Sequence, residues 1–147
     1  MSSPAATFLQ QITIVPDQLE DWGPLEEATG QEMLTSGSEL WSEGNQSAGI
    51  WRCTPGPSRW SFDSVAEFIH VLDGSMTVTA DGGEPMKVGA GDLAVFPRGW
   101  SGTWDIHEPL TKAYVPATGS DPDGLRPEVR TAPPRGSASR TYRRAWG

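Results

Sequence analysis

The chain has a single cysteine, Cys53, and two histidines among its 147 residues. One cysteine excludes a disulfide within the chain and is typical of proteins from a reducing compartment. The sequence also lacks an apolar run of about eighteen residues, so no segment is predicted to span a membrane. Its N-terminus has no basic segment followed by an apolar one, the pattern of a secretory signal. We therefore expect a cytoplasmic protein without a membrane partner, with Cys53 as a small core residue.

Positive charge is scarce in residues 1–116, which carry sixteen acidic residues against five lysines and arginines, a net charge of −11. Residues 117–147 carry six arginines against three acids, a net charge of +3. Binding to nucleic acid depends on a positive surface that pairs with phosphates. The acidic body of the chain therefore argues against nucleic acid as a partner.

What the sequence does contain is a series of short strand-forming runs separated by glycine-rich turns. Residues 67–72 are rich in β-branched and aromatic side chains, stop at Asp73-Gly74, and are followed by another strand-forming run at 75–80. Two such runs around an Asp-Gly pair are typical of a tight hairpin, which we predict at this point.

Further turn signals follow at short intervals. A second hairpin is predicted through residues 81–84, and a strand at residues 93–96 ends at Pro97-Arg98-Gly99. Strands separated by turns roughly every eight to twelve residues indicate an all-β sandwich or small barrel.

These residues resemble the cupin superfamily. Glu67 is followed after six residues by Gly74, and Gly91-Asp92 and Pro97-x-Gly99 come later, as in the cupin signature. Further segments resemble the single-domain cupins grouped with (S)-ureidoglycine aminohydrolase: residues 49–56 (Gly-Ile-Trp-Arg-Cys-Thr-Pro-Gly), 59–60 (Arg-Trp), 102–104 (Gly-Thr-Trp) and 108–114 (from Glu-Pro-Leu to Tyr). The resemblance implies an all-β cupin fold, a jelly roll or double-stranded β-helix barrel.

The chain then divides into three parts. Residues 1–36 are expected to form an N-terminal arm and residues 37–116 the cupin barrel. Residues 117–147 are a tail rich in arginine, proline and glycine, which we expect to be flexible because it has too few apolar residues to order itself. Removing residues 120–147 should therefore leave the barrel folded.

The arm holds two candidate elements. Residues 12–15 are a candidate edge strand, and residues 17–27 a short helix or 3₁₀ turn with Leu19, Trp22 and Leu25 at three-residue spacing. These apolar side chains are expected to cover an edge of the barrel; the alternative is a lid or a dimer contact. Because cupins commonly pair, we predict a homodimer.

The resemblance also implies a metal site, because cupins place a His-x-His pair before the glutamate and a third histidine after Pro-x-Gly. In this chain the pair positions hold Ser61 and Asp63, or Trp60 and Phe62 with the other spacing, and the third position holds Gly102. Without the three imidazoles we expect no bound Mn²⁺, Fe²⁺ or Zn²⁺ and no other cofactor.

The two histidines lie elsewhere. His70 is three residues beyond Glu67, and an odd separation on a strand places two side chains on opposite faces. His107 is likewise an odd step from Trp104. We interpret both as surface or interface residues rather than ligands.

Glu67 is the candidate centre of the site. Its neighbours on the same strand face, Ile69 and Val71, are apolar, so its carboxyl group must be paired, hydrogen-bonded or protonated. The candidate partners are Arg59, Lys112 and the hydroxyl of Tyr114. A structural ion pair, a general acid/base of raised pKa and a carboxylate that holds a polar substrate group all fit the sequence.

Aromatic side chains complete the predicted site. The chain has seven tryptophans, and alternation places Trp100 and Trp104 on the face where cupins carry the last histidine. Indoles beside one carboxylate suit a flat or apolar organic ligand, or a cation. We predict Glu67, Lys112 and Tyr114 as catalytic residues. The predicted substrate-binding residues are Arg59, Trp60, Ser61, Asp63, Ile69, Trp100 and Trp104.

Three functions are weighed. The favoured one is an enzyme that performs metal-independent acid/base chemistry, namely isomerisation, cyclisation, elimination or hydrolysis, on a small organic molecule. The second is a non-catalytic ligand-binding cupin. The third is a metal-dependent aminohydrolase or oxygenase, against which the missing histidines argue.

Overall fold

The computed structural model describes residues 5–8, 16–44 and 46–117. The predicted edge strand at 12–15 and all of the predicted tail except Ala117 lie outside these residues. Apart from a 3₁₀ turn at Pro16–Gln18, the elements are strands: β1 (Glu20–Pro24), β2 (Leu34–Glu43), β3 (Gln46–Cys53), β4 (Gly56–Ser61), β5 (Glu67–Ala80), β6 (Met86–Gly89), β7 (Leu93–Phe96) and β8 (Ser101–Pro116). Nowhere in the described ranges is there a helix long and apolar enough to cross a membrane.

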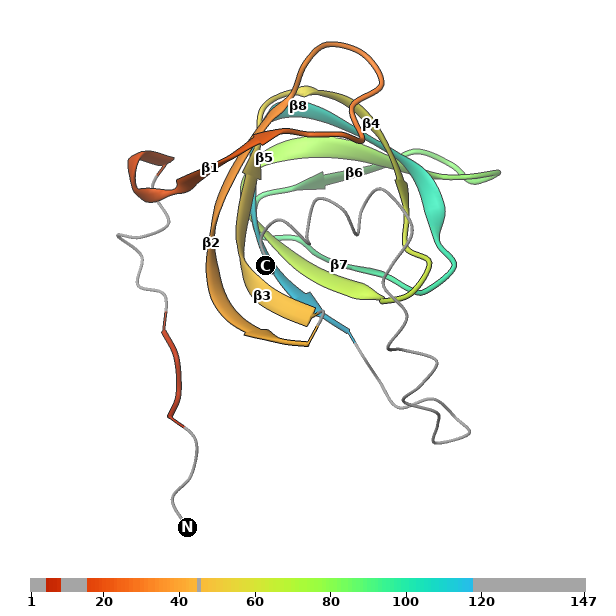
Figure 1. The fold of residues 1–147 in the computed structure, drawn as a ribbon. Coiled ribbons are helices and arrows are strands. Elements are labelled where there is room, and N and C mark those ends of the chain that lie inside the picture. The colour runs from red at the N-terminus through yellow and green to blue at the C-terminus, as the bar shows by residue number, and fades with distance from the viewer. Residues whose placement is uncertain (1–4, 9–15, 45, 118–147) are drawn as a thin grey trace, which may run out of the picture.

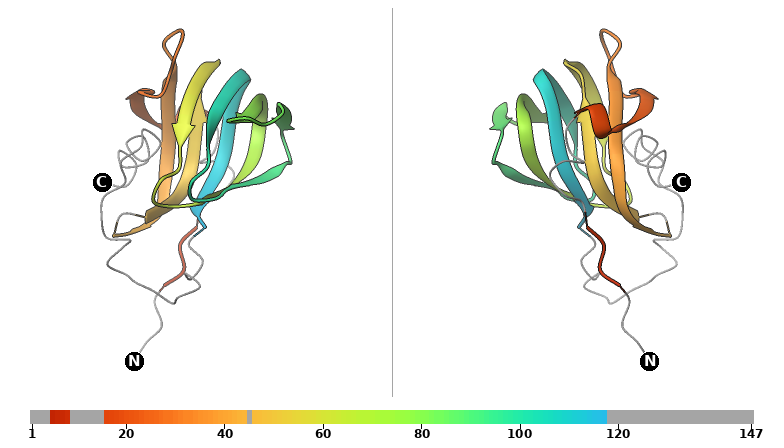
Figure 2. Two further views of the ribbon diagram at one scale, coloured as in Figure 1. Left: turned by 90° about the vertical axis from the view of Figure 1, so that its right-hand side faces the viewer. Right: turned by 90° about the vertical axis from the view of Figure 1, so that its left-hand side faces the viewer.

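The strands form an antiparallel jelly roll, as predicted. They pair in the order β1-β2-β3-β8-β5-β6, with β4 also on β8 and β7 also on β5. Figure 1 shows these strands curving around a common interior, with β2 and β3 on one side and β6 and β7 on the other. In the side views of Figure 2 they run next to one another along the barrel. The all-β fold class is confirmed.

Two long strands connect the halves of the barrel. The first part of β8 pairs with β4 and the last part with β3. β5 pairs with β8 almost throughout, and also with β6 and β7. Side chains that point inward from β5 and β8 therefore meet inside the barrel, which is what positions the candidate site.

The predicted hairpin at Asp73-Gly74 is wrong. β5 runs through both residues, and its register against β8 shifts on either side of Asp73 and again after Ser75. Gly74 has φ of +89°, and a Cβ built on it would lie 2.1 Å from the carbonyl oxygen of Pro109. The Asp-Gly pair provides the left-handed residue that a bulge needs, rather than a chain reversal.

Replacing Gly74 by alanine is expected to lower the free energy of unfolding by about 2–5 kcal/mol. The left-handed backbone costs an L-residue about 1–2 kcal/mol, and the clash with the Pro109 backbone adds an overpacking cost of about 1–3 kcal/mol. Gly82 is the matched control, because its φ is +77° but nothing lies within 4 Å of a Cβ there. In denaturant melts, Gly82→Ala should lower the free energy of unfolding only by the cost of the left-handed backbone, about 1–2 kcal/mol. Equal losses in the two variants would contradict the close approach at Gly74.

The second predicted hairpin is confirmed. β5 turns through residues 81–85 into β6, with Val78 opposite Met86. The strand predicted at residues 93–96 is β7, and it is followed by a turn in which Gly99 has φ of +93°.

The N-terminal arm folds differently from the helix or turn predicted at residues 17–27. The 3₁₀ turn ends at Gln18, and β1 then pairs with β2. Gly23-Pro24 does not favour a helix, whereas the free edge of β2 offers hydrogen bonds to an extended segment. Trp22 and Leu25 are each 5% exposed and belong to the core. These two side chains therefore cover the barrel, as expected.

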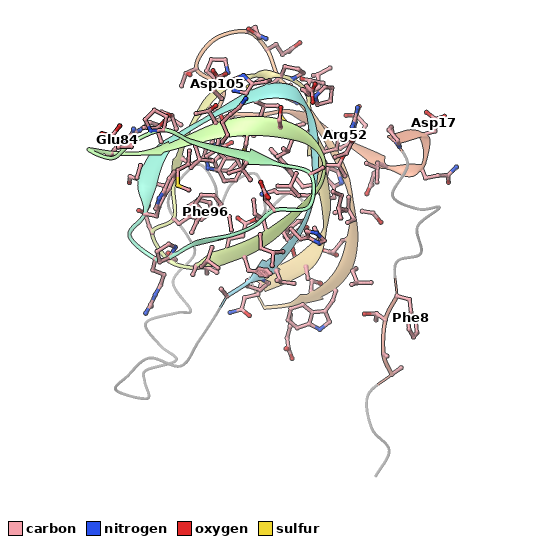
Figure 3. The ribbon with its side chains drawn as sticks, turned by 180° about the vertical axis from the view of Figure 1, so that it is seen from behind. Phe8, Asp17, Arg52, Glu84, Phe96 and Asp105 are labelled. Atoms are coloured by element: carbon pink, nitrogen blue, oxygen red, sulfur yellow. The ribbon has the colours of Figure 1, made fainter. Side chains whose placement is uncertain are left out.

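Aromatic rings fill one end of the interior. Trp60 stacks on Trp104 and Phe62 stacks on Phe96, with ring centroids 4.5 and 5.3 Å apart. Figure 3 shows Phe96 pointing into the barrel. Face-to-face contacts of this kind bury a large apolar area and hold the rings in defined orientations.

Candidate functional site

A buried ion pair lies inside the barrel. Lys112 Nζ on β8 is 2.9 Å from Glu67 Oε2 on β5, and the two side chains are 0% and 7% exposed. The next inward residues of β5, Ile69 and Val71, are also buried. Alternation therefore placed Glu67 correctly, and of its three candidate partners Lys112 is the one in the observed ion pair.

Two indole rings enclose the ammonium group. Lys112 Nζ lies 4.6 Å from the ring centroid of Trp51 and 4.6 Å from that of Trp104. The two ring planes are 79° apart. A desolvated ammonium group over aromatic faces is attracted by their quadrupoles. The rings thus hold the cation at one point while Glu67 balances its charge.

Burial is the largest influence on the lysine. It lowers the pKa of Lys112, and the nearby Glu67 carboxylate opposes this by favouring the charged amine. A lysine of lowered pKa releases a proton more readily than an exposed one. The pair is therefore suited to moving protons as well as to holding a polar group.

Tyr114 borders the same space. Its hydroxyl is 3.4 Å from Ser47 Oγ, at the outer limit of a hydrogen bond, and both residues are buried. Burial raises the pKa of Tyr114, with a smaller effect in the same direction from Glu67. The phenol is therefore neutral over the physiological pH range.

The other predicted substrate-binding residues divide between the two faces of the barrel wall. Trp60, Ile69 and Trp104 point inward and are buried, and Trp100 is half-buried. Trp100 packs edge-on against Phe96, with ring centroids 4.9 Å apart.

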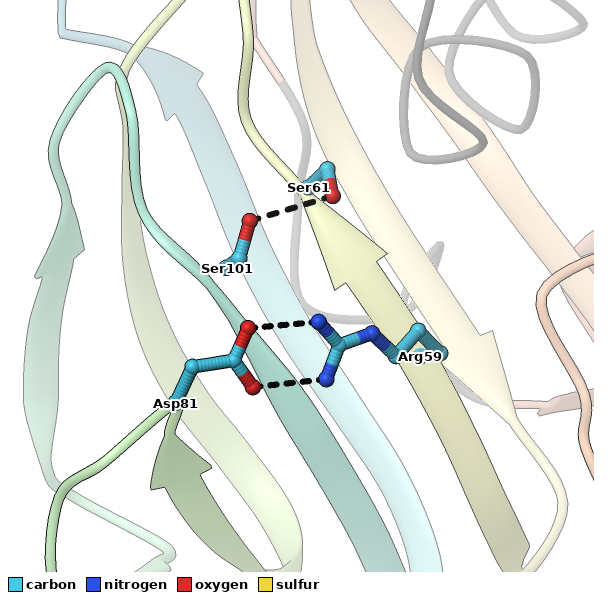
Figure 4. A network of polar contacts seen from close by, with 4 residues as sticks. All are labelled: Arg59, Ser61, Asp81 and Ser101. Atoms are coloured by element: carbon cyan, nitrogen blue, oxygen red, sulfur yellow. Dashed lines mark hydrogen bonds and ion pairs between the residues drawn. The ribbon is translucent and has the colours of Figure 1, made fainter.

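Arg59, Ser61 and Asp63 do not join Glu67. Arg59 forms a two-pronged ion pair with Asp81, with nitrogen–oxygen distances of 2.7 and 2.5 Å, and both side chains are about half exposed. Ser61 is 3.2 Å from the hydroxyl of Ser101. Figure 4 shows the two contacts close together, with Arg59 and Ser61 on β4, Ser101 on β8 and Asp81 in the turn after β5. Asp63 is exposed. Arg59 and Ser61 therefore make contacts on the face of β4 that points away from the interior.

The residues present do not fit a divalent metal. The positions of the missing histidines hold inward-facing Trp60 and Phe62, or the outer residues Ser61 and Asp63. At Gly102 even a Cβ would lie 2.3 Å from the carbonyl oxygen of Thr79. The parts of the chain with described positions hold no group of three or more histidine, cysteine or acidic residues able to bind a metal. Beside the remaining glutamate lies an ammonium group, which repels a second cation.

Both histidines lie on the surface, as predicted. His70 is exposed on the outer face of β5. His107 is exposed on β8, where its Nε2 is 2.7 Å from Thr77 Oγ1. The register shifts of β5 begin after Val71 and so leave the alternation between Glu67 and His70 intact.

The sequence prediction did not assign Trp51, Cys53 or Ser47 to this site. Trp51 and Cys53 point inward from β3, where Trp51 lies opposite Lys112 and Cys53 opposite Leu110. Only the pairing of β3 with the last part of β8 reveals this, because the alternation of a single strand does not identify its neighbour. Glu27, which is 3% exposed, is a second buried acid that the prediction did not identify.

Cys53 provides a test of the electrostatics of the site. Burial raises the pKa of its thiol to about 12. The folded protein thus favours the neutral thiol. This contribution to the free energy of unfolding is complete below the ordinary thiol pKa and is lost as the pH rises towards about 12. Between about pH 9 and about pH 11, wild-type protein should lose about 1.4 kcal/mol per pH unit more than Cys53→Ala. Parallel losses in urea melts of the two proteins would show that the thiol ionises freely.

A family model for the EutQ-like cupin domain matches residues 41–114. No protein with a curated description matches the chain. The grouping with ureidoglycine aminohydrolase is thus still a prediction.

Several solved structures share the fold. A protein of unknown function from the DUF861 family of Pseudomonas syringae pv. tomato has a TM-score of 0.60 at 16% identity, over 67% of this chain and 44% of that one. Ethanolamine utilization protein Q of Salmonella typhimurium LT2 has a TM-score of 0.56 at 20% identity, over 79% and 96%. The cupin domain of Schizosaccharomyces pombe Cnp3 has a TM-score of 0.51 at 17% identity, over 58% and 65%. This chain therefore spans less than half of the Pseudomonas protein, and at these identities the likeness shows the fold alone.

Proposed function

The chain belongs to the family of EutQ-like cupin domains, and we propose that it is an enzyme that moves protons on a small organic molecule. Glu67 is the general base and Lys112 the cation that stabilises developing negative charge. The observation that carries the proposal is the buried Lys112–Glu67 pair, 2.9 Å long and enclosed by indole rings.

The surroundings of the pair support this role. In a water-poor interior, electrostatic interactions are stronger than in water, and groups held in place need no reorganisation during the reaction. A carboxylate and an amine of lowered pKa side by side provide a proton acceptor and a proton donor. Since the donor set does not fit a divalent ion, the chemistry assigned to these residues involves no metal.

A general probe of proton abstraction tests the proposal. Nitrobenzisoxazole is flat and aromatic, and loss of its one acidic C–H proton opens the ring to a coloured phenolate. Wild-type protein should accelerate this elimination with saturation kinetics, and Glu67→Gln should remove most of the acceleration. Turnover by wild type no faster than by acetate at the same carboxylate concentration would overturn the proposal.

The second candidate is a non-catalytic ligand-binding domain. It is favoured by the mutual neutralisation of Lys112 and Glu67, since such a pair also occurs as a purely structural contact. In that case nitrobenzisoxazole should quench tryptophan fluorescence on binding without being converted. The homodimer and the cytoplasmic location likewise stay predictions from the sequence.

A further inference from the structure

The indole N–H groups of the core fall into two classes. Four described tryptophans are buried. Trp60 Nε1 donates to Ser58 Oγ at 2.7 Å, and Trp22 Nε1 donates to Glu20 Oε1 at 3.3 Å. Trp51 Nε1 and Trp104 Nε1 are buried and have no acceptor among the described residues.

The two N–H groups without an acceptor belong to the two rings that contact Lys112. Their ring centroids are 6.3 Å apart, and each ring lies 4.6 Å from Nζ. A buried N–H without an acceptor costs free energy, so nearly all such groups in native proteins are paired. Two such donors, on the two rings that enclose one buried cation, therefore need an explanation.

We propose that these N–H groups bind the oxygen of a neutral carbonyl compound, such as a ketone, aldehyde or amide, beside Lys112. This inference rests on the proposed function and specifies its substrate class. A carbonyl oxygen has two lone pairs, so one oxygen accepts hydrogen bonds from two N–H donors. The side chain of Glu67 is 7% exposed and that of Lys112 is 0% exposed, so a ligand that enters from solvent would meet the carboxylate first.

The charges around the site favour a neutral oxygen over a carboxylate. Lys112 is already balanced by Glu67 at 2.9 Å. The thiol of Cys53 and the phenol of Tyr114 are both neutral, because burial raises their pKa values. The other buried acid, Glu27, provides no positive charge that could balance a ligand carboxylate. A ligand carboxylate would bring an unbalanced negative charge into the interior, which is costly.

This arrangement defines the proton transfer. The Glu67 carboxylate removes a proton from the carbon next to the carbonyl group. The C–H electron pair becomes a C=C bond to the carbonyl carbon, and the carbonyl π pair moves onto the oxygen. Lys112 and the indole N–H groups stabilise that enolate oxygen. Return of the proton from Glu67 to the same carbon or to another completes an exchange or an isomerisation.

Cyclohexanone is the probe, and cyclohexanecarboxylate the matched anion. In protein with labelled tryptophan side chains, the indole N–H resonances of Trp51 and Trp104, assigned from nuclear Overhauser effects, should move downfield with saturation as cyclohexanone is added. The resonance of Trp22, whose N–H donates to Glu20, should stay in place. Absence of any shift at Trp51 and Trp104 up to the solubility limit would overturn the proposal, as would equally tight binding of the carboxylate.

Single substitutions measure independently how much each indole N–H contributes to cyclohexanone binding. Trp51→Phe and Trp104→Phe keep an aromatic face but remove the N–H donor, and each should weaken cyclohexanone binding about 3–10-fold, the usual effect of one hydrogen bond. Trp22→Phe is the control, since its N–H already donates to Glu20 and Trp22 was not assigned to the site. Equal weakening in all three variants would mean that packing, not the N–H groups, determines binding.

The failures of the two proposals are distinguishable. Cyclohexanone binding at both indoles, with no elimination of nitrobenzisoxazole, would remove the acid/base function and leave the carbonyl site. Elimination that depends on Glu67 but continues unchanged in Trp51→Phe and Trp104→Phe, without cyclohexanone shifts, would keep the function and remove the carbonyl site.

Discussion

Replacing Glu67 by glutamine is expected to slow the elimination of nitrobenzisoxazole by about 10²–10⁴-fold, the usual contribution of a general base. Glutamine keeps the shape of the side chain and still hydrogen-bonds the Lys112 amine, but it accepts no proton. Because burial already lowers the pKa of Lys112, removing the carboxylate lets the amine lose its proton rather than stay charged. The variant should therefore stay folded while it loses turnover.

Glu84→Gln is the control for this experiment. Glu84 is exposed in the turn after β5, and Figure 3 shows it at the outer end of that turn. The Glu84→Gln variant should convert nitrobenzisoxazole at the wild-type rate. If Glu67→Gln keeps wild-type kcat and an unchanged melt, Glu67 has neither a catalytic nor a structural role.

Replacing Lys112 by methionine is expected to lower the free energy of unfolding by about 3–5 kcal/mol. Methionine fills a similar space between Trp51 and Trp104 but leaves the carboxylate of Glu67 buried without its cation, and breaking a buried pair from one side has this cost. Protonation of the carboxyl group removes the buried charge, so the deficit should shrink as the pH falls. Denaturant melts over a pH series measure both effects.

A double variant separates the pair from its packing. Glu67→Gln combined with Lys112→Met removes both charges, and it should recover much of the stability lost in Lys112→Met, because replacing both members of a buried pair is often nearly neutral. Lys87→Met, at an exposed position on β6, should change stability by less than about 0.5 kcal/mol. A loss below about 1 kcal/mol in Lys112→Met would contradict the expected cost of leaving the Glu67 carboxylate buried without its cation.

The sequence predicted the barrel and the inward direction of its central side chains because both depend on local patterns. Alternation along β5 and β8 placed Glu67, Lys112 and Tyr114 inside, and glycine-rich turns marked most strand ends. The hairpin at Asp73-Gly74 was wrong because a bulge and a two-residue turn both require a glycine with positive φ. The sequence around such a glycine does not show whether the chain reverses there.

Contacts between strands could not be predicted in the same way. Trp51 was missed as a neighbour of Lys112 because their contact depends on the register of β3 against β8. Arg59 was expected beside Glu67, although the next residue, Trp60, points inward and so turns Arg59 outward to Asp81. The alternation of β4 left either face open as the inner one, and only the packed barrel decides between them.

The pairing of β5 with β8 also bears on how the protein folds and opens. Its register joins Ala80 to Gly102 at one end and Glu67 to Pro116 at the other, so each pair closes a loop that contains β6 and β7. Such non-local contacts slow folding, and they form late because the chain entropy of loop closure must be overcome first. Since both halves of the barrel share these two strands, neither half should persist alone. Amide protons of β3, β5 and β8 should therefore exchange with solvent through one common opening of the barrel.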